Sequence, residues 1–246
     1  MLSLVKIIGL LALTGIAWAL TPAIKDAARV VDPVATEGMA IDTDSGYSYL
    51  ALGDSYTIGE SVPAAERYPV QAARLMRLAH YNCLDPEIIA TTGWTTANLL
   101  DGISAKMKPL SKYDIVSLLI GVNNQYQGGS QAEYRDEFSS LVRQSIQLAG
   151  NRPSRVIVLS IPDYSVTPFA RGGNTALIAS GIDAFNAINF QVSMEYKVNY
   201  VDITGESRKA ANDPSLIASD GLHFSGKEYE VWADKMELIM KVMLEK

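Results

Sequence analysis

Three residues of this sequence could combine to make a reactive hydroxyl. Ser55 stands in the stretch YLALGDSYTIGE, directly after a short apolar run. A serine hydroxyl attacks a carbonyl only when a neighbouring base takes its proton. His223 is the candidate base, and Asp220 could hold its other ring nitrogen. The other histidine, His80, ends an expected amphipathic helix over 68–81, where a surface position is typical. We therefore predict a catalytic triad of Ser55, His223 and Asp220.

Three hydrogen-bond donors are candidates for stabilising the oxyanion that such an attack creates. They are the backbone N–H groups of Ser55 and Gly93 and the side-chain amide of Asn123. Donors fixed in advance are needed because the charge develops on the carbonyl oxygen only during the reaction.

Three further residues are candidate contacts for the substrate. Asp54 adjoins the expected nucleophile, and Tyr126 and Phe169 lie in later loops, on the acyl or leaving-group side of the site. Each of the two aromatic residues is equally typical of ordinary loop packing.

Five short apolar runs predict the strands that would position these residues. Most runs are continuous rather than alternating, which is typical of strands covered on both faces of a parallel sheet. Segments with helical spacing separate them, so we expect a three-layer α/β/α sandwich with a five-stranded parallel sheet in the flavodoxin-like strand order 2-1-3-4-5. The runs are SYLAL (48–52), EIIAT (87–91), DIVSLLI (114–120), SRVIVLSI (154–161) and NYVDI (199–203).

Two later segments show apolar residues at helical spacing, over 134–149 and 229–243. The second is preceded by Ser225-Gly226-Lys227-Glu228, which fits a capping box and predicts where this helix begins.

The candidate site residues all follow strands of the predicted sheet. Ser55, Gly93 and Asn123 come after the first three strands, and Asp220 and His223 lie in the loop after the fifth. Ligands bind outside the carboxyl ends of the strands in such sheets, so these residues should converge on one crevice.

The four ordered blocks resemble those of the SGNH/GDSL hydrolases, which are named for a Ser, a Gly, an Asn and a His. Here these residues would be Ser55 in YLALGDSYT, Gly93 in TTGWTT, Asn123 in IGVNN and His223 in SDGLHFSG. The resemblance is closest to the bacterial lysophospholipase-like branch. It implies a serine esterase that acts on a small ester, such as an acyl ester, a lysophospholipid or an acetylated sugar, without a metal or an organic cofactor.

Three positions depart from the family pattern. Tyr56 stands where leucine is usual, Asn124 where aspartate is usual, and Phe224 where proline is common. Thr57 removes the second glycine of a G-x-S-x-G elbow, which argues against the ordinary α/β-hydrolase fold.

Composition excludes some classes of protein and suggests a location. The 246 residues carry a net charge of −6 without a Lys/Arg cluster, which argues against a nucleic-acid partner. Residues 1–19 have the pattern of a signal peptide that ends in Ala-Trp-Ala, so export to the periplasm or medium is expected. An uncleaved membrane anchor over 7–20 is the alternative. A linker over 20–46 and a hydrolase domain over 47–246 would follow.

The sequence leaves two other functions open. One is a carbohydrate O-acetylesterase, and the other is a binding module with the same sheet and an inactive site. The oligomeric state and the physiological ester do not follow from the sequence.

Overall fold

The protein is described by a computed structural model that covers residues 46–107 and 112–245. The expected signal peptide, 1–19, lies outside these residues, as does nearly all of the expected linker, 20–46. Within the described ranges, no helix combines the length and the apolar character needed to span a membrane.

Five parallel strands form one sheet in the order β2-β1-β3-β4-β5, which confirms the predicted order. The side chains of β1, β3 and β4 are buried on both faces, as their continuous apolar runs predicted. The strands are β1 (Tyr49–Gly53), β2 (Glu87–Ala90), β3 (Ile115–Leu119), β4 (Val156–Leu159) and β5 (Asn199–Val201).

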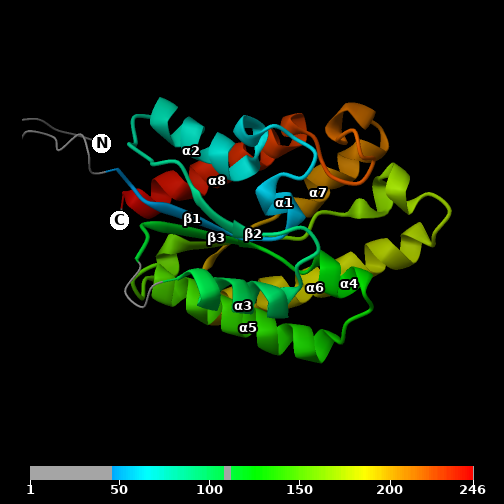
Figure 1. Cartoon of the computed structure of the whole chain (residues 1–246), viewed down its shortest axis with the longest axis horizontal. Helices are drawn as coiled ribbons and strands as arrows, with labels where there is room; N and C mark the ends of the chain where they lie inside the picture. The colour runs from blue at the N-terminus through cyan, green and yellow to red at the C-terminus, as the bar shows by residue number, and fades with distance from the viewer. Residues whose placement is uncertain (1–45, 108–111, 246) are drawn as a thin grey trace, which may run out of the picture. The chain divides into compact units, whose positions relative to one another are not determined.

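Helices cover both faces of the sheet, which confirms the α/β/α sandwich. Figure 1 shows α2 and α8 side by side on one face and α3, α5 and α6 on the other. The α-helices are α1 (Ser55–Ile58), α2 (Tyr68–Leu78), α3 (Thr96–Lys106), α4 (Val122–Tyr126), α5 (Gln131–Leu148), α6 (Thr175–Tyr196), α7 (Thr204–Ser207) and α8 (Gly226–Leu244). Short 3₁₀ helices are η1 (Ala64–Glu66), η2 (Pro153–Arg155), η3 (Tyr164–Val166), η4 (Pro168–Ala170), η5 (Arg208–Ala211) and η6 (Pro214–Leu216).

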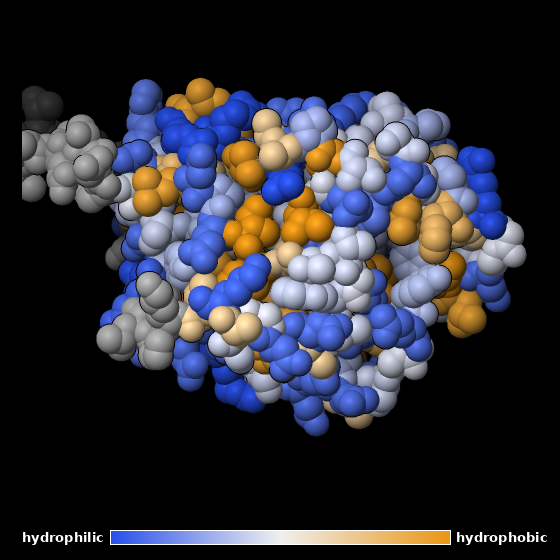
Figure 2. Space-filling view, viewed as in Figure 1, coloured by the Kyte–Doolittle hydropathy of each residue, from blue (hydrophilic) through white to orange (hydrophobic). Residues whose placement is uncertain are grey.

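The edge strand β2 is less well covered than the central strands. Glu87 at its start is exposed and Ile88 is half-buried. Figure 2 shows apolar residues reaching the surface between the two helix layers, in the region where Figure 1 places this edge.

The expected helices over 134–149 and 229–243 are α5 and α8. The expected helix over 68–81 is shorter, because α2 ends at Leu78 and His80 has a left-handed backbone with φ of 67°. A non-glycine residue in this conformation does not continue a right-handed helix.

The predicted capping box at the start of α8 is wrong. Ser225 is the N-cap residue, but its hydroxyl donates to the carbonyl oxygen of Ser215 at 2.8 Å. The Glu228 carboxylate is buried and accepts a hydrogen bond from Trp232 Nε1 at 2.7 Å. The side chains of Ser225 and Glu228 therefore bond to Ser215 and Trp232, and not to the backbone N–H groups at the start of α8 that a capping box would use.

The register of the sheet explains why the site residues converge. Gly53 at the end of β1 lies opposite Ala90 at the end of β2 and opposite Leu119 at the end of β3. The three strands therefore end at the same level, and the segments that lead to Ser55, Gly93 and Asn123 leave the same edge of the sheet.

Candidate active site

Ser55 begins α1 directly after β1, at a turn that only glycine allows. A Cβ atom on Gly53 would lie 2.0 Å from Thr57 Oγ1, so the strand and the helix pack too closely for any side chain. Asp54 caps the helix, because its Oδ1 accepts a hydrogen bond from the N–H of Tyr56 at 3.0 Å. Ser55, the predicted nucleophile, is thus held at the first position of a helix, where backbone N–H groups are unpaired.

Asp220 and His223 form the expected carboxylate–imidazole pair. His223 Nδ1 lies 2.6 Å from Asp220 Oδ2, and Oδ1 accepts the N–H groups of Leu222 at 2.9 Å and of His223 at 3.0 Å. Burial opposes ionisation of Asp220, but hydrogen bonds from His223, Ser61 and the backbone hold its pKa well below the usual range. An ionised carboxylate only accepts hydrogen bonds, so Nδ1 must carry the proton and Nε2 is left as the basic nitrogen.

The imidazole of His223 is also positioned by an aromatic ring. Tyr56 packs edge-on against it with ring centroids 5.5 Å apart, and Tyr56 in turn packs against the fully buried Trp232 at 6.2 Å. Tyr56 appeared in the sequence only as a departure from the family pattern. In the structure it joins the imidazole of His223 to the aromatic core between α2 and α8.

Gly93 and Asn123 have positions suited to oxyanion donors. Gly93 has a φ of 82°, and no atom lies within 4 Å of where its Cβ would be, so the backbone there faces open space. Asn123 Nδ2 donates one hydrogen to the carbonyl oxygen of Trp94 at 2.9 Å, which fixes the side chain. The second amide hydrogen remains for a ligand.

The residues of all four sequence blocks meet at one cavity. It has a volume of about 150 Å³, is open to solvent and is mostly apolar. Tyr126 and Phe169, the predicted substrate contacts, both line it, and their rings are 6.0 Å apart. The lining residues are Ser55, Tyr56, Thr92, Gly93, Val122, Asn123, Tyr126, Tyr164, Phe169, Leu222 and His223.

Ser55 and His223 share this cavity, but no hydrogen bond joins Ser55 Oγ to His223 Nε2, although the structure describes both residues. Such bonds are often long in free enzymes and tighten when the substrate binds.

Asp54, a predicted substrate contact, does not line the cavity. Its side chain is only 1% exposed, and its Oδ2 is buried without a hydrogen-bond partner among the described residues. Burial raises the pKa of Asp54 to about 7, against the opposing effect of the hydrogen bond from the Tyr56 N–H. Asp54 therefore acts in the structure as a buried helix cap.

This burial predicts a pH-dependent change in stability for Asp54→Asn. The folded-state pKa of about 7 lies above the unfolded value, so the folded protein binds more protons and loses stability as pH rises from about 4 to 7. Asparagine keeps a capping oxygen without the charge. The free energy of unfolding of the variant minus that of the wild type should grow by roughly 3–4 kcal/mol over this window, measured by urea denaturation. A difference that does not vary with pH would contradict the buried carboxylate.

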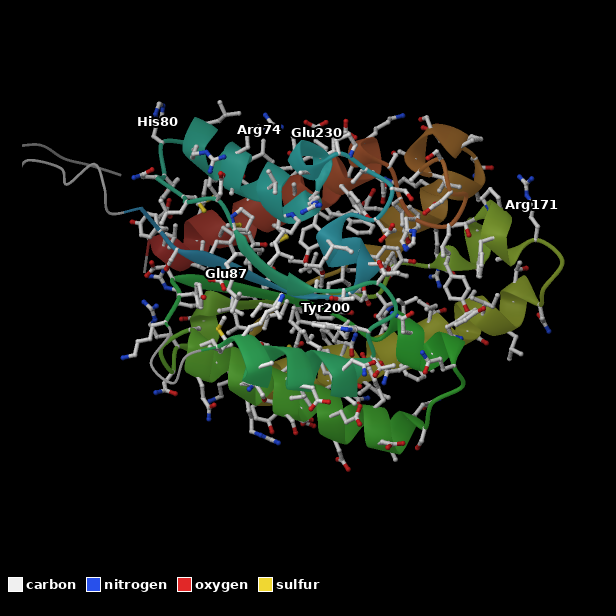
Figure 3. All side chains as sticks on the ribbon, viewed as in Figure 1. Arg74, His80, Glu87, Arg171, Tyr200 and Glu230 are labelled. Carbon is white, nitrogen blue, oxygen red and sulfur yellow. The ribbon has the colours of Figure 1, made fainter. Side chains whose placement is uncertain are left out.

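His80 lies outside the site. Figure 3 shows it beyond the end of α2 with its side chain directed away from the protein, and it is exposed. His223 is therefore the histidine that can serve Ser55.

Besides Tyr56, sequence reasoning missed several other residues at or beside the site. Thr92 and Tyr164 line the cavity, and the Ser61 hydroxyl donates to Asp220 Oδ2 at 2.7 Å. Thr92 directly precedes Gly93, a predicted oxyanion donor, and this adjacency could have identified it. Nothing in the sequence indicated Ser61, because only folding brings it next to Asp220.

The described residues contain no group of three or more His, Cys, Asp or Glu side chains placed to hold a metal ion. The polar side chains of the residues that line the cavity are hydroxyls, one imidazole and one amide.

A five-stranded parallel sheet of this order, with a serine, a glycine, an asparagine and a histidine around one cavity, is the architecture of the SGNH hydrolases. The profile of the GDSL-like lipase/acylhydrolase family matches residues 51–231, and the chain belongs to this family. It is a carboxylic ester hydrolase. No curated protein sequence matches it.

Solved structures of esterases share the fold at low sequence identity. The psychrotrophic esterase EstA from Pseudoalteromonas sp. is 16% identical, with a TM-score of 0.62, and the match covers 81% of this chain and 100% of that one. A lipase/acylhydrolase from Enterococcus faecalis is 18% identical, with a TM-score of 0.62 and coverage of 81% and 96%. The acetylxylan esterase Axe2 from Geobacillus stearothermophilus is 19% identical, with a TM-score of 0.59 and coverage of 80% and 94%.

Proposed function

We propose that the protein hydrolyses esters of short acyl groups through an acyl-enzyme on Ser55. The observation that carries this proposal is the cavity shared by Ser55, His223 and the donors Gly93 and Asn123, with Asp220 bonded behind the imidazole. Each group has the chemical type that one step of ester cleavage requires, and their shared cavity supports the proposal.

In the first half of the reaction, Ser55 Oγ attacks the carbonyl carbon while its proton passes to His223 Nε2. The backbone N–H groups of Ser55 and Gly93 and the Asn123 amide donate to the oxyanion. The carbon–oxygen bond to the alcohol then breaks, and His223 returns the proton to the departing oxygen. Asp220 stays ionised throughout and stabilises the imidazolium.

In the second half, a water molecule gives a proton to His223 Nε2 and attacks the acyl carbon. The bond to Ser55 Oγ breaks and His223 reprotonates it, so the carboxylic acid leaves and the free enzyme is restored.

A fluorophosphonate probe tests the nucleophile directly. The folded wild-type protein should form a covalent adduct that peptide mass spectrometry locates at Ser55, since the probe reacts only with an activated hydroxyl. Denatured protein should remain unlabelled. Folded protein that is not labelled, or is labelled at another serine, would overturn the proposed nucleophile.

The preference for short chains rests on the size of the cavity and on the ring at its mouth. A short acyl group fits within about 150 Å³, whereas a long chain must extend beyond the cavity that Phe169, which is 49% exposed, lines. We expect kcat/KM for p-nitrophenyl acetate and butyrate to exceed that for palmitate.

The variant Phe169→Ala tests whether this ring contacts the acyl chain. Each methylene group of the acyl chain that loses its contact with the ring removes about 0.8 kcal/mol of stabilisation. The loss of kcat/KM in the variant should therefore be at least roughly fourfold greater for p-nitrophenyl butyrate than for the acetate. Equal losses on both substrates would instead place Phe169 on the leaving-group side.

Removal of acetyl groups from a carbohydrate is a second candidate function. The exposed rings of Tyr126 and Phe169 flank the cavity and could stack on a sugar ring, and Axe2, which shares the fold, is an acetylxylan esterase. Acetate released from acetylated xylan, compared with fatty acid released from lysophosphatidylcholine, separates the polysaccharide substrate from the lysophospholipid one.

A further inference from the structure

The turn over residues 59–61, which follows α1, is bonded to the nucleophile through the backbone. The N–H groups of Gly59 and Glu60 both donate to the carbonyl oxygen of Ser55, the second at 2.9 Å. Gly59 and Ser61 have left-handed backbones, with φ of 62° and 65°. The turn therefore cannot shift without moving the residue that carries the reactive hydroxyl.

The Ser61 side chain joins this turn to the acid–base loop. Its hydroxyl donates to Asp220 Oδ2 at 2.7 Å, and the same oxygen lies 2.6 Å from His223 Nδ1. Serine is uncommon in a left-handed conformation, because its Cβ is crowded there. Ser61 is exposed, so burial does not explain its presence, whereas the hydrogen bond to Asp220 does.

The Glu60 side chain joins the turn to the loop that carries Gly93. Its carboxylate accepts a hydrogen bond from the hydroxyl of Thr92, which lines the cavity next to Gly93. Consecutive residues of one turn thus contact the acid–base loop and a donor loop, while the backbone beside them holds Ser55.

We propose that residues 59–61 are a positioning turn that fixes the nucleophile, the Gly93 loop and the Asp220–His223 pair relative to one another, with Ser61 acting on His223 through Asp220. This role rests on the proposed function. Neither the Glu60 nor the Ser61 side chain lines the substrate cavity, so the turn acts through other residues.

Ser61 should affect charge as well as geometry. Its hydroxyl shares the negative charge of the oxygen that faces His223 Nδ1. Without it, more of that charge faces the imidazole, which favours the charged form of the ring over the neutral form that accepts the Ser55 proton.

The main variant is Ser61→Gly, which removes the hydroxyl and suits the left-handed backbone. We expect kcat to fall about tenfold with KM nearly unchanged, the effect of losing one hydrogen bond to a charged group. The acid limb of kcat/KM against pH should move to higher pH. The matched control is Lys197→Gly, at an exposed left-handed residue with φ of 57° after α6, which should leave both measurements unchanged.

A double-mutant cycle tests whether Ser61 acts through Asp220. In an Asp220→Asn background, Ser61→Gly should lower kcat no further, because the carboxylate it acts on is gone. A tenfold loss that persists in that background would overturn the proposal. So would a Ser61→Gly enzyme with wild-type kcat and an unshifted acid limb.

The Glu60 contact has its own test. Glu60→Ala should lower kcat several-fold without moving the acid limb, whereas Glu60→Gln, which keeps an acceptor oxygen for Thr92, should lose less. Equal losses in the two variants would remove Glu60 from the proposal.

One measurement separates failure of this inference from failure of the proposed function. The NMR signal of the His223 Nδ1 proton requires no turnover, and Ser61→Gly should shift it while Lys197→Gly should not. An unchanged signal overturns the Ser61 role even in an active enzyme. A wild-type protein that no fluorophosphonate labels overturns the function, whatever the signal does.

Discussion

Replacing Ser55 with alanine is expected to lower kcat for p-nitrophenyl acetate by about 10⁴–10⁶-fold, the loss typical of removing the nucleophile of a catalytic triad. His223 and the oxyanion donors remain in place, so a small residual rate above the buffer reaction should persist. The fold should be retained, because the Ser55 hydroxyl makes no hydrogen bond within the described residues and its backbone bonds do not depend on the side chain.

The control for this variant is Ser104→Ala, which removes an exposed serine hydroxyl from α3 that bonds only to the carbonyl of Leu100. It should keep full activity. Thermal unfolding of both variants shows whether a loss of activity results from a loss of folded protein. Equal background turnover by wild type and Ser55→Ala would contradict a serine hydrolase and favour the binding module that the sequence left open.

The sheet could be predicted from the sequence because its strands depend on local patterns. Continuous apolar runs mark strands that are buried on both faces. Once the strands are placed, the rule that ligands bind at their carboxyl ends brings Ser55, Gly93, Asn123 and His223 to one cavity, as the structure shows.

Helix α6 could not be located from periodicity, because its polar and apolar residues do not fall on separate faces. Leu177 and Met194 are exposed, whereas Asn189 is buried and accepts a hydrogen bond from the Tyr134 hydroxyl at 2.6 Å. A buried polar side chain with its partner on another helix breaks the pattern on which the prediction depends.

The roles of Asp54 and Ser61 depend on contacts that the sequence does not contain. Asp54 adjoins the nucleophile, which suggested a substrate contact, but the turn after β1 directs its carboxylate into the protein. Ser61 and its partner Asp220 are 159 residues apart. Sequence patterns report neighbours on one helix or strand, and neither contact is of that kind.

Replacing Asn123 with alanine is expected to lower kcat by about 10²–10³-fold with little change in KM, because an oxyanion donor acts mainly in the transition state. Asn123→Asp should be at least as impaired, since an ionised carboxylate cannot donate and repels the developing charge. The carbonyl of Trp94 loses its partner in both variants, so unfolding should be measured beside activity to separate that structural loss from the loss of the donor.

The neighbouring residue provides the matched control, because Asn124 has the same side chain with its hydrogen bonds already used. Its Oδ1 accepts the N–H of Thr96 at 3.0 Å, its Nδ2 donates to the Thr96 hydroxyl at 2.7 Å, and it does not line the cavity with Asn123. Asn124→Ala should therefore cost about 1–3 kcal/mol of stability while kcat stays within a few-fold of wild type. If the two alanine variants lost turnover equally, Asn123 would be an anchor of the Gly93 loop and not a donor to the oxyanion.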